Sequence, residues 1–103
     1  MAENVREVFE VEDWEVDLER ETIHGRIVLI KPVDRDFLED ELIDKLKELM
    51  MLFLKEDEDA KEKYGGNVEE VEIEEIELDP DRDSYEGDEE IEFEAMYKVI
   101  KSE

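Results

Sequence analysis

The sequence predicts an α+β fold: an antiparallel sheet of four to five strands, in the order β-β-(β)-α-β-β, with one long helix packed on one face. A central segment repeats apolar residues at helical spacing, whereas the segments on both sides of it alternate apolar and acidic residues at strand spacing. Glycine and proline residues separate these segments. The chain has 103 residues and no internal repeat, so a single acidic domain over residues 1–103 is expected.

The N-terminal third is expected to form two or three strands. Residues 5–12 alternate loosely, and the phase of the alternation slips at Asp13, which indicates a bulge. Beyond the bulge, the pattern predicts a hairpin of residues 14–23 and 26–31, with a tight His-Gly turn at 24–25. The bulge would join this hairpin to the N-terminal strand.

The long helix is expected to run from Asp36 to about Lys63. Asp36 has the side chain of an N-cap, and Glu39 has the spacing of its partner in a capping box. Two glycines at 65–66 supply the stop. One side of the helix carries an apolar stripe that would pack on the sheet. The stripe consists of Leu38, Leu42, Leu46, Leu49 and Phe53.

Six consecutive apolar residues at 49–54 do not fit a helix that is covered on one side only. Two explanations remain open at this stage. The end of the helix could be wedged between the sheet and a terminal segment. Alternatively, Met50, Met51 and Leu54 could form a second contact surface, most simply that of a homodimer.

Two more strands are expected after the helix. Residues 68–78 alternate with a change of phase, which favours a bulged strand, although a helix is an alternative there. Residues 79–88 contain proline and glycine and are expected to form a loop. Residues 90–100 alternate regularly. Their inward set is Ile91, Phe93, Ala95, Tyr97 and Val99.

The charge of the chain is extreme and restricts the possible partners. There are 37 acidic and 13 basic residues, which give a net charge of −24. A field of this sign opposes direct binding to nucleic acid or to an anionic membrane. The absence of cysteine excludes disulfides and thiolate zinc sites. The first four residues carry no positive charge and no apolar stretch follows them, so a cytoplasmic location is expected.

The acidic residues are concentrated in the predicted strands. Residues 69–94 contain 15 acidic residues and one basic residue, whereas residues 24–68 contain 12 and eight. On the outward side of a strand, alternate residues lie about 6.6–7 Å apart. Successive phosphates of one DNA strand are also on the order of 6–7 Å apart. The predicted partner-binding residues are Glu15, Asp17, Glu19, Glu21, Glu70, Glu72, Glu74, Glu90, Glu92 and Glu94.

Residue types that could support catalysis are scarce. The chain has two serines, one histidine and no nucleophile motif, so neither an enzyme nor a cofactor is expected. One loop has the spacing of a calcium loop, with Asp79, Asp81, Asp83 and Glu90 at positions 1, 3, 5 and 12. Position 6 is Ser84 instead of glycine, and strands flank the loop. No dedicated metal site is therefore predicted, and these four carboxylates are the one candidate set for Ca²⁺.

The leading hypothesis is a non-enzymatic binding protein that mimics nucleic acid and blocks a basic groove of a DNA- or RNA-binding protein. In composition, the chain resembles the small acidic inhibitors that viruses and mobile elements direct at restriction, CRISPR or transcription machinery. The alternative is a small structural or adaptor domain, homodimeric through the helix, whose charge serves solubility or adaptation to salt or heat. A calcium-binding module is a lesser alternative.

Overall fold

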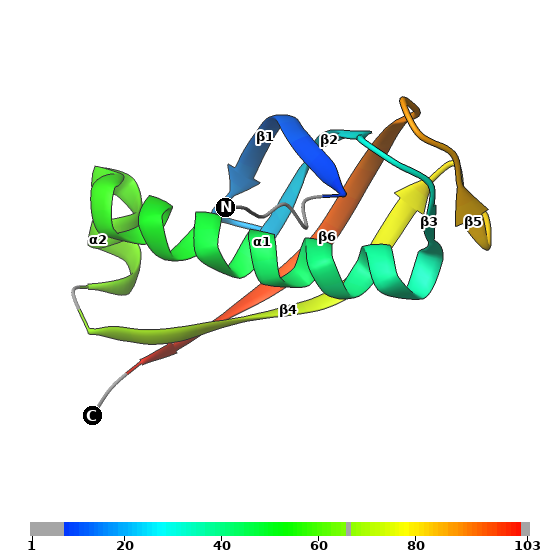
Figure 1. Cartoon of the computed structure of the whole chain (residues 1–103). Helices are drawn as coiled ribbons and strands as arrows, with labels where there is room; N and C mark the ends of the chain where they lie inside the picture. Colours follow the sequence, from blue (N-terminus) through cyan, green and yellow to red (C-terminus); the bar gives the residue numbers. More distant parts are fainter. Residues whose placement is uncertain (1–7, 66, 102–103) are drawn as a thin grey trace, which may run out of the picture.

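The computed structural model describes residues 8–65 and 67–101. Residues 5–7 of the predicted first strand and Gly66 of the predicted helix stop lie outside the described residues. The elements follow the predicted strand–helix–strand order (Figure 1). They are β1 (Phe9–Asp17), β2 (Thr22–Leu29), β3 (Val33–Asp34), α1 (Arg35–Glu56), α2 (Glu58–Tyr64), β4 (Val68–Asp79), β5 (Ser84–Tyr85) and β6 (Glu90–Lys101).

The four longer strands form one antiparallel sheet in the order β1-β2-β6-β4, and β3 pairs with β5 in a small second sheet. Helix α1 crosses one face of the four-stranded sheet (Figure 1). Tyr64 of α2 contacts Tyr97, an inward residue of β6, so both helices lie on the same side of the sheet, and within the described residues the other face carries no helix. The predicted α+β fold with an antiparallel sheet and a long helix is confirmed.

The core lies between α1 and the sheet. On the helix, a row at intervals of four residues is fully or almost fully buried, from Leu38 to Leu54. On β6, four of the five predicted inward residues are buried, and Val99 is half-buried at the end of the strand. The alternation that predicted β6 therefore identified its inward face correctly.

The predicted turn at His24 and Gly25 is wrong, because both residues lie inside β2. The chain turns instead over residues 18–21, where the Asp17 carboxylate accepts hydrogen bonds from two backbone N–H groups of the turn. The predicted bulge near Asp13 is present within β1. It presses the strand against Gly25, where an added Cβ would lie 2.2 Å from the carbonyl oxygen of Asp13. Glycine is needed there for close backbone approach, not for a turn.

The single predicted helix is two helices. Asp57 has non-helical backbone angles between α1 and α2, and its side chain accepts a hydrogen bond from Ala60 N–H, so it caps α2. At the start of α1 the N-cap is Asp34, and the predicted N-cap Asp36 lies within the first turn. The predicted capping box is also absent from this helix start, because Glu39 accepts a hydrogen bond from Arg35 Nε.

The apolar run at 49–54 is mostly part of the core. Met50 is 0% exposed and Leu54 is 4% exposed. The contact surface predicted from Met50, Met51 and Leu54 is therefore corrected, because two of its three side chains are not accessible to a partner. Leu52 is the exposed member of the run, at 51%. Phe53, which was predicted in the stripe, instead meets Trp14 at the side of the helix, with ring centroids 6.0 Å apart.

Candidate functional site

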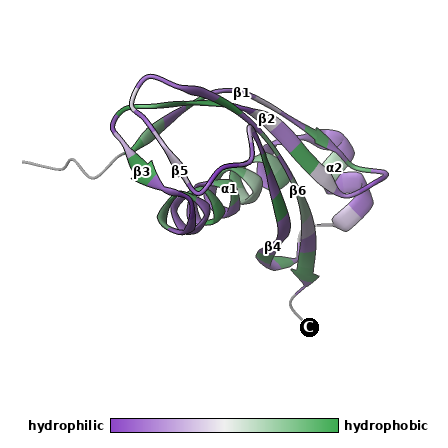
Figure 2. Ribbon diagram, turned by 90° about the vertical axis from the view of Figure 1, so that its right-hand side faces the viewer, coloured by the Kyte–Doolittle hydropathy of each residue, from purple (hydrophilic) through white to green (hydrophobic). Residues whose placement is uncertain are grey.

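The helix-free face of the four-stranded sheet, here called the outer face, gathers acidic side chains from three strands. Alternation along each strand and the register of the pairs place the same set of residues on this side. In Figure 2, purple and green alternate along β4 and β6, which reflects this division. The acidic members are Glu10, Asp13, Glu15 and Asp17 from β1, Glu70, Glu72, Glu74, Glu77 and Asp79 from β4, and Glu90, Glu92 and Glu94 from β6.

Eight of the ten predicted partner-binding residues lie on the outer face, and two do not. Glu19 lies in the turn between β1 and β2. Glu21 lies at the end of that turn, and its carboxylate accepts a hydrogen bond from the hydroxyl of Tyr64 on the helix side of the sheet, at 2.8 Å. The alternation was extended too far along β1, because the strand ends at Asp17 and the turn changes the direction of the side chains.

Four acidic residues of the outer face were missed, Glu10 and Asp13 on β1 and Glu77 and Asp79 on β4, and the two on β4 were missed because that strand is bulged. The pairing of β4 with β6 shifts between Glu74 and Glu77, and Glu75 there has a φ of 47°. Beyond the shift, Glu77 and Asp79 join the outer face, while Leu78 is buried. The change of phase was visible in the sequence, and applying it to the acidic residues would have found both.

The register sets carboxylates directly against each other. Glu77 pairs with Glu94, and Asp79 pairs with Glu92. Side chains in directly opposed pairs have Cβ atoms about 4.5–5.5 Å apart, and like charges at that distance destabilise the sheet. The outer face therefore contains unfavourable electrostatic repulsion at the end of the sheet where β4 ends and β6 begins.

The same end of the outer face is hollowed. A depression of about 660 Å³, here called the acidic hollow, reaches across all four strands. Side chains adjacent to both bulges contribute to it, so the bulges help to shape its sides. Its charged lining residues are Asp13, Asp17, Arg20, Arg26, Glu77, Asp79, Glu92 and Glu94, with His24 in the same depression.

Arg26 is one of the two basic residues that line the acidic hollow, beside Arg20. Its guanidinium nitrogens lie 3.8 Å from a carboxylate oxygen of Glu12, 4.0 Å from one of Asp13 and 3.5 Å from one of Glu90. One positive charge is thus shared among three carboxylates, all at least 42% exposed, and such surface pairs are individually weak. The acidic hollow consequently keeps an excess of negative charge.

The acidic character fades toward the other end of the outer face. Past Glu94, the outward residues of β6 are Met96, Lys98 and Ile100. Lys98 is opposite Glu72, so this pair between β4 and β6 is attractive, whereas the two pairs between the same strands in the acidic hollow are repulsive. On the outer face, the acidic residues of β6 are therefore the three predicted ones, Glu90, Glu92 and Glu94, and toward the other end the acidic residues are Glu70, Glu72 and Glu74 of β4.

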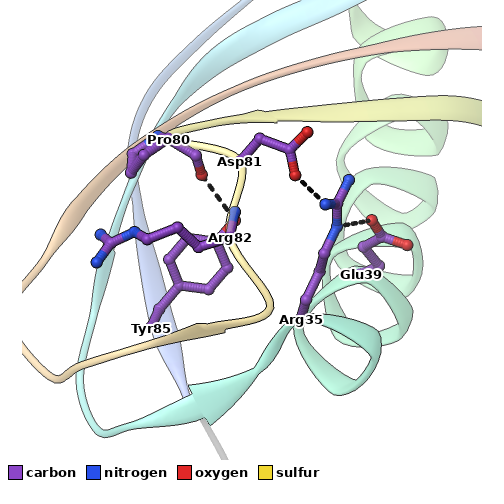
Figure 3. Close-up of polar contacts among 6 residues, drawn as sticks. All are labelled: Arg35, Glu39, Pro80, Asp81, Arg82 and Tyr85. Atoms are coloured by element: carbon purple, nitrogen blue, oxygen red, sulfur yellow. Dashed lines mark hydrogen bonds and ion pairs between the residues drawn. The ribbon is translucent and has the colours of Figure 1, made fainter.

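The four carboxylates of the candidate set for Ca²⁺ are not brought together. Asp81 forms an ion pair with Arg35, which also binds Glu39 (Figure 3). Glu90 lies on the outer face beside Arg26. Within residues 8–65 and 67–101, no group of three or more acidic, histidine or cysteine side chains has the arrangement of a metal site.

The loop is held by Tyr85 instead. The Tyr85 side chain is buried, and its hydroxyl donates to the carbonyl of Pro80 at 2.7 Å and accepts from the N–H of Arg82 at 3.0 Å (Figure 3). The Arg35 backbone N–H donates to the carbonyl of Asp83 at 2.9 Å. The Tyr85 contacts hold the loop together, and the Arg35 contact attaches it to the start of α1.

On the helix side, α2 is attached to the turn between β1 and β2. Tyr64 donates to Glu21, and its hydroxyl lies 3.0 Å from that of Tyr97. Burial, together with these hydrogen bonds, raises the pKa of Tyr64 above its ordinary value. Burial also raises the pKa of Tyr97. Both hydroxyls are therefore neutral structural groups, and they lie away from the outer face.

Comparison of the chain with protein-family models, with curated proteins and with solved structures found no match. In the described part of the chain, none of the helices combines the length and the apolar character needed to span a bilayer. A functional assignment must therefore come from the charges and shapes of the chain's own surfaces.

Proposed function

We propose that the protein is a non-enzymatic acidic binding protein whose outer face mimics the phosphate surface of a nucleic acid. Its partner would be a basic, nucleic-acid-binding protein. The observation that supports the proposal is the gathering of twelve carboxylates from three strands on the outer face. Along a strand they are about 6.6–7 Å apart, which is close to the spacing on the order of 6–7 Å between successive phosphates of one DNA strand.

The opposed carboxylates favour a use for the charge beyond solubility. A sheet that needed only to stay soluble could place lysine or threonine opposite Glu94 and Glu92. Instead, Glu77 and Asp79 occupy those positions, at a cost of about 0.2–1 kcal/mol for each pair. A basic partner that enters the acidic hollow would relieve this repulsion, so part of the stored free energy would favour binding.

The mechanism is competition. The basic surface that normally binds phosphates would be covered by the outer face, and the shape of the acidic hollow suits a protruding basic element at its centre. The charge of −24 would steer the partner into fast association, and salt would weaken the complex strongly.

The test begins with purified, tagged protein and a nuclease-treated lysate of the source organism or its host, eluted with rising salt. Each eluted protein is then bound to labelled duplex DNA or RNA, and the acidic protein is added as a competitor. The proposal predicts that a partner released sharply by salt also loses its nucleic acid. Assorted basic proteins that any polyanion displaces equally would contradict it.

Charge-reversal variants locate the surface. Changing Glu77, Glu92 and Glu94 to lysine should weaken competition at least about tenfold, because it reverses the field of the acidic hollow. The matched control changes three exposed acidic residues of the helices by the same total charge: Asp40, Glu58 and Glu62. Equal losses in both variants would mean that only net charge matters, and the proposed outer-face site would be wrong.

A further inference from the structure

A second surface lies at the edge of the sheet, between β1 and α1. β1 is an edge strand of the sheet, because among the described residues β2 is the one strand that pairs with it. Two adjoining depressions of about 470 and 420 Å³ run along this edge and share Trp14 and Leu49. They are called here the β1 groove.

The floor of the β1 groove is apolar. Val11 and Trp14 contribute from β1, and Leu49, Leu52 and Phe53 contribute from α1. The ring of Trp14 meets Phe53 edge to face, and both remain only partly buried. Leu52 is 51% exposed, so this surface keeps apolar area that a partner could remove from water.

The rim of the β1 groove is acidic. On the helix, Glu41, Asp44, Glu48 and Glu56 recur at intervals of three, four and eight residues, so they follow one side of α1. Lys45 is the basic residue among the groove-lining residues. The strand side adds outward carboxylates, which continue onto the outer face. An occupant must therefore combine apolar groups with positive charge.

We propose that the β1 groove binds an extended segment of a partner protein in which apolar and basic residues alternate, and that this segment adds a fifth strand to the sheet. At a sheet edge, alternate backbone N–H and C=O groups point away from the neighbouring strand and can pair with an added strand. Side chains of the added strand alternate between the two faces. One set would enter the apolar floor, and the other would lie beside the acidic outer face.

The bulge limits where the strand can pair. It interrupts β1 between Val11 and Asp13, and a bulge disturbs the regular pairing on both sides of a strand. The added strand should therefore pair with residues 13–17, next to the part of the groove that Trp14, Leu52 and Phe53 line. A second copy of this chain is a poor occupant, because its β1 would bring Glu15 and Asp17 against identical charges.

This inference deepens the proposed function, on which it rests for the positive charge of the partner. It differs in the source of affinity, which comes here from the backbone edge and the apolar floor. The two can fail separately, because the outer-face residues changed in the test of the proposed function, Glu77, Glu92 and Glu94, do not line the β1 groove.

The test uses two end-blocked synthetic peptides of eight residues, made of four lysines and four valines. In one peptide lysine and valine alternate, and in the other the four lysines precede the four valines. The reporter is the fluorescence of Trp14, the chain's single tryptophan, which lies in the β1 groove. We expect the alternating peptide to change the emission saturably and to bind at least about tenfold more tightly. Equal affinities would overturn the proposal, because they would show binding by charge alone.

The matched variants are Leu52→Ser and Phe37→Ser. Both side chains are about half exposed on α1, at 51% and 49%, and of the two only Leu52 lines the β1 groove. Leu52→Ser should weaken the alternating peptide about tenfold, which corresponds to about 1.4 kcal/mol, and Phe37→Ser should not. Equal effects would overturn the proposal. If outer-face reversal abolished partner binding while Leu52→Ser had no effect, this inference would fail and the proposed function would stand.

Discussion

The opposed carboxylates of the acidic hollow make a prediction about stability that does not require the partner. Glu94 lies directly opposite Glu77, so replacing it with glutamine removes one repulsive pair and keeps the size of the side chain. Glu72 lies opposite Lys98 in the same pair of strands, so Glu72→Gln removes an attractive pair. Both variants change the net charge equally, which makes each the control for the other.

The magnitude follows from the register. Directly opposed side chains have Cβ atoms about 5 Å apart, and charge pairs at that distance contribute about 0.2–1 kcal/mol. Coulomb's law gives a similar figure of about 0.8 kcal/mol at 5 Å in water. Glu94→Gln should therefore stabilise the protein by about 0.2–1 kcal/mol, and Glu72→Gln should destabilise it by a similar amount. In a domain of this size the two shifts correspond to roughly 1–8 °C in Tm, in opposite directions.

The assay is thermal unfolding followed by circular dichroism at low and high salt. At about 0.01 M salt the Debye length is about 30 Å, and at about 1 M it is about 3 Å, so both shifts should shrink strongly at the higher concentration. Relief of net charge alone would raise the Tm of both variants. If Glu72→Gln stabilised the protein as much as Glu94→Gln, the register-based account of the repulsion would be refuted.

Two further predictions concern the frame that holds these surfaces. Gly25→Ala should destabilise the protein by about 1–3 kcal/mol in urea unfolding, because the new Cβ would meet the Asp13 carbonyl oxygen at 2.2 Å. Gly87→Ala is the control, since its nearest contact is an ordinary 3.4 Å, and an equal loss there would contradict the close-approach explanation. For Tyr64 and Tyr97, the raised pKa values mean that the unfolded chain loses these protons at lower pH than the folded one. Their contribution to stability is complete below about pH 10 and is lost as the pH rises above it. Tyr64→Phe should cost about 0.5–1.5 kcal/mol at neutral pH and flatten this alkaline loss, measured by unfolding at a series of pH values. An unchanged pH dependence in the variant would remove Tyr64 as its source.

Local pattern determined a large part of this protein. The α+β class, the position of the long helix and the inward residues of β6 follow from periodicity, because period 2 and period 3.6 each fix which side chains share a face. The concentration of acidic residues in the strands was equally visible, since alternation with apolar residues forces them to the outward side. For the same reason, eight of the ten predicted partner-binding residues lie on the outer face.

Tertiary structure decided what local pattern left ambiguous. Glycine at 25 looked like a turn residue, but its role is to admit the bulge of the neighbouring strand, and only the pairing of β1 with β2 reveals that contact. Met50 and Leu54 were candidates for a contact with a partner, yet both are buried in the core. The acidic hollow likewise forms across four strands, and the β1 groove forms between β1 and α1, so both bring together segments that are distant in the sequence. Periodicity specifies which residues share a face, whereas register, bulges and helix placement specify which faces meet, and those depend on contacts across the whole chain.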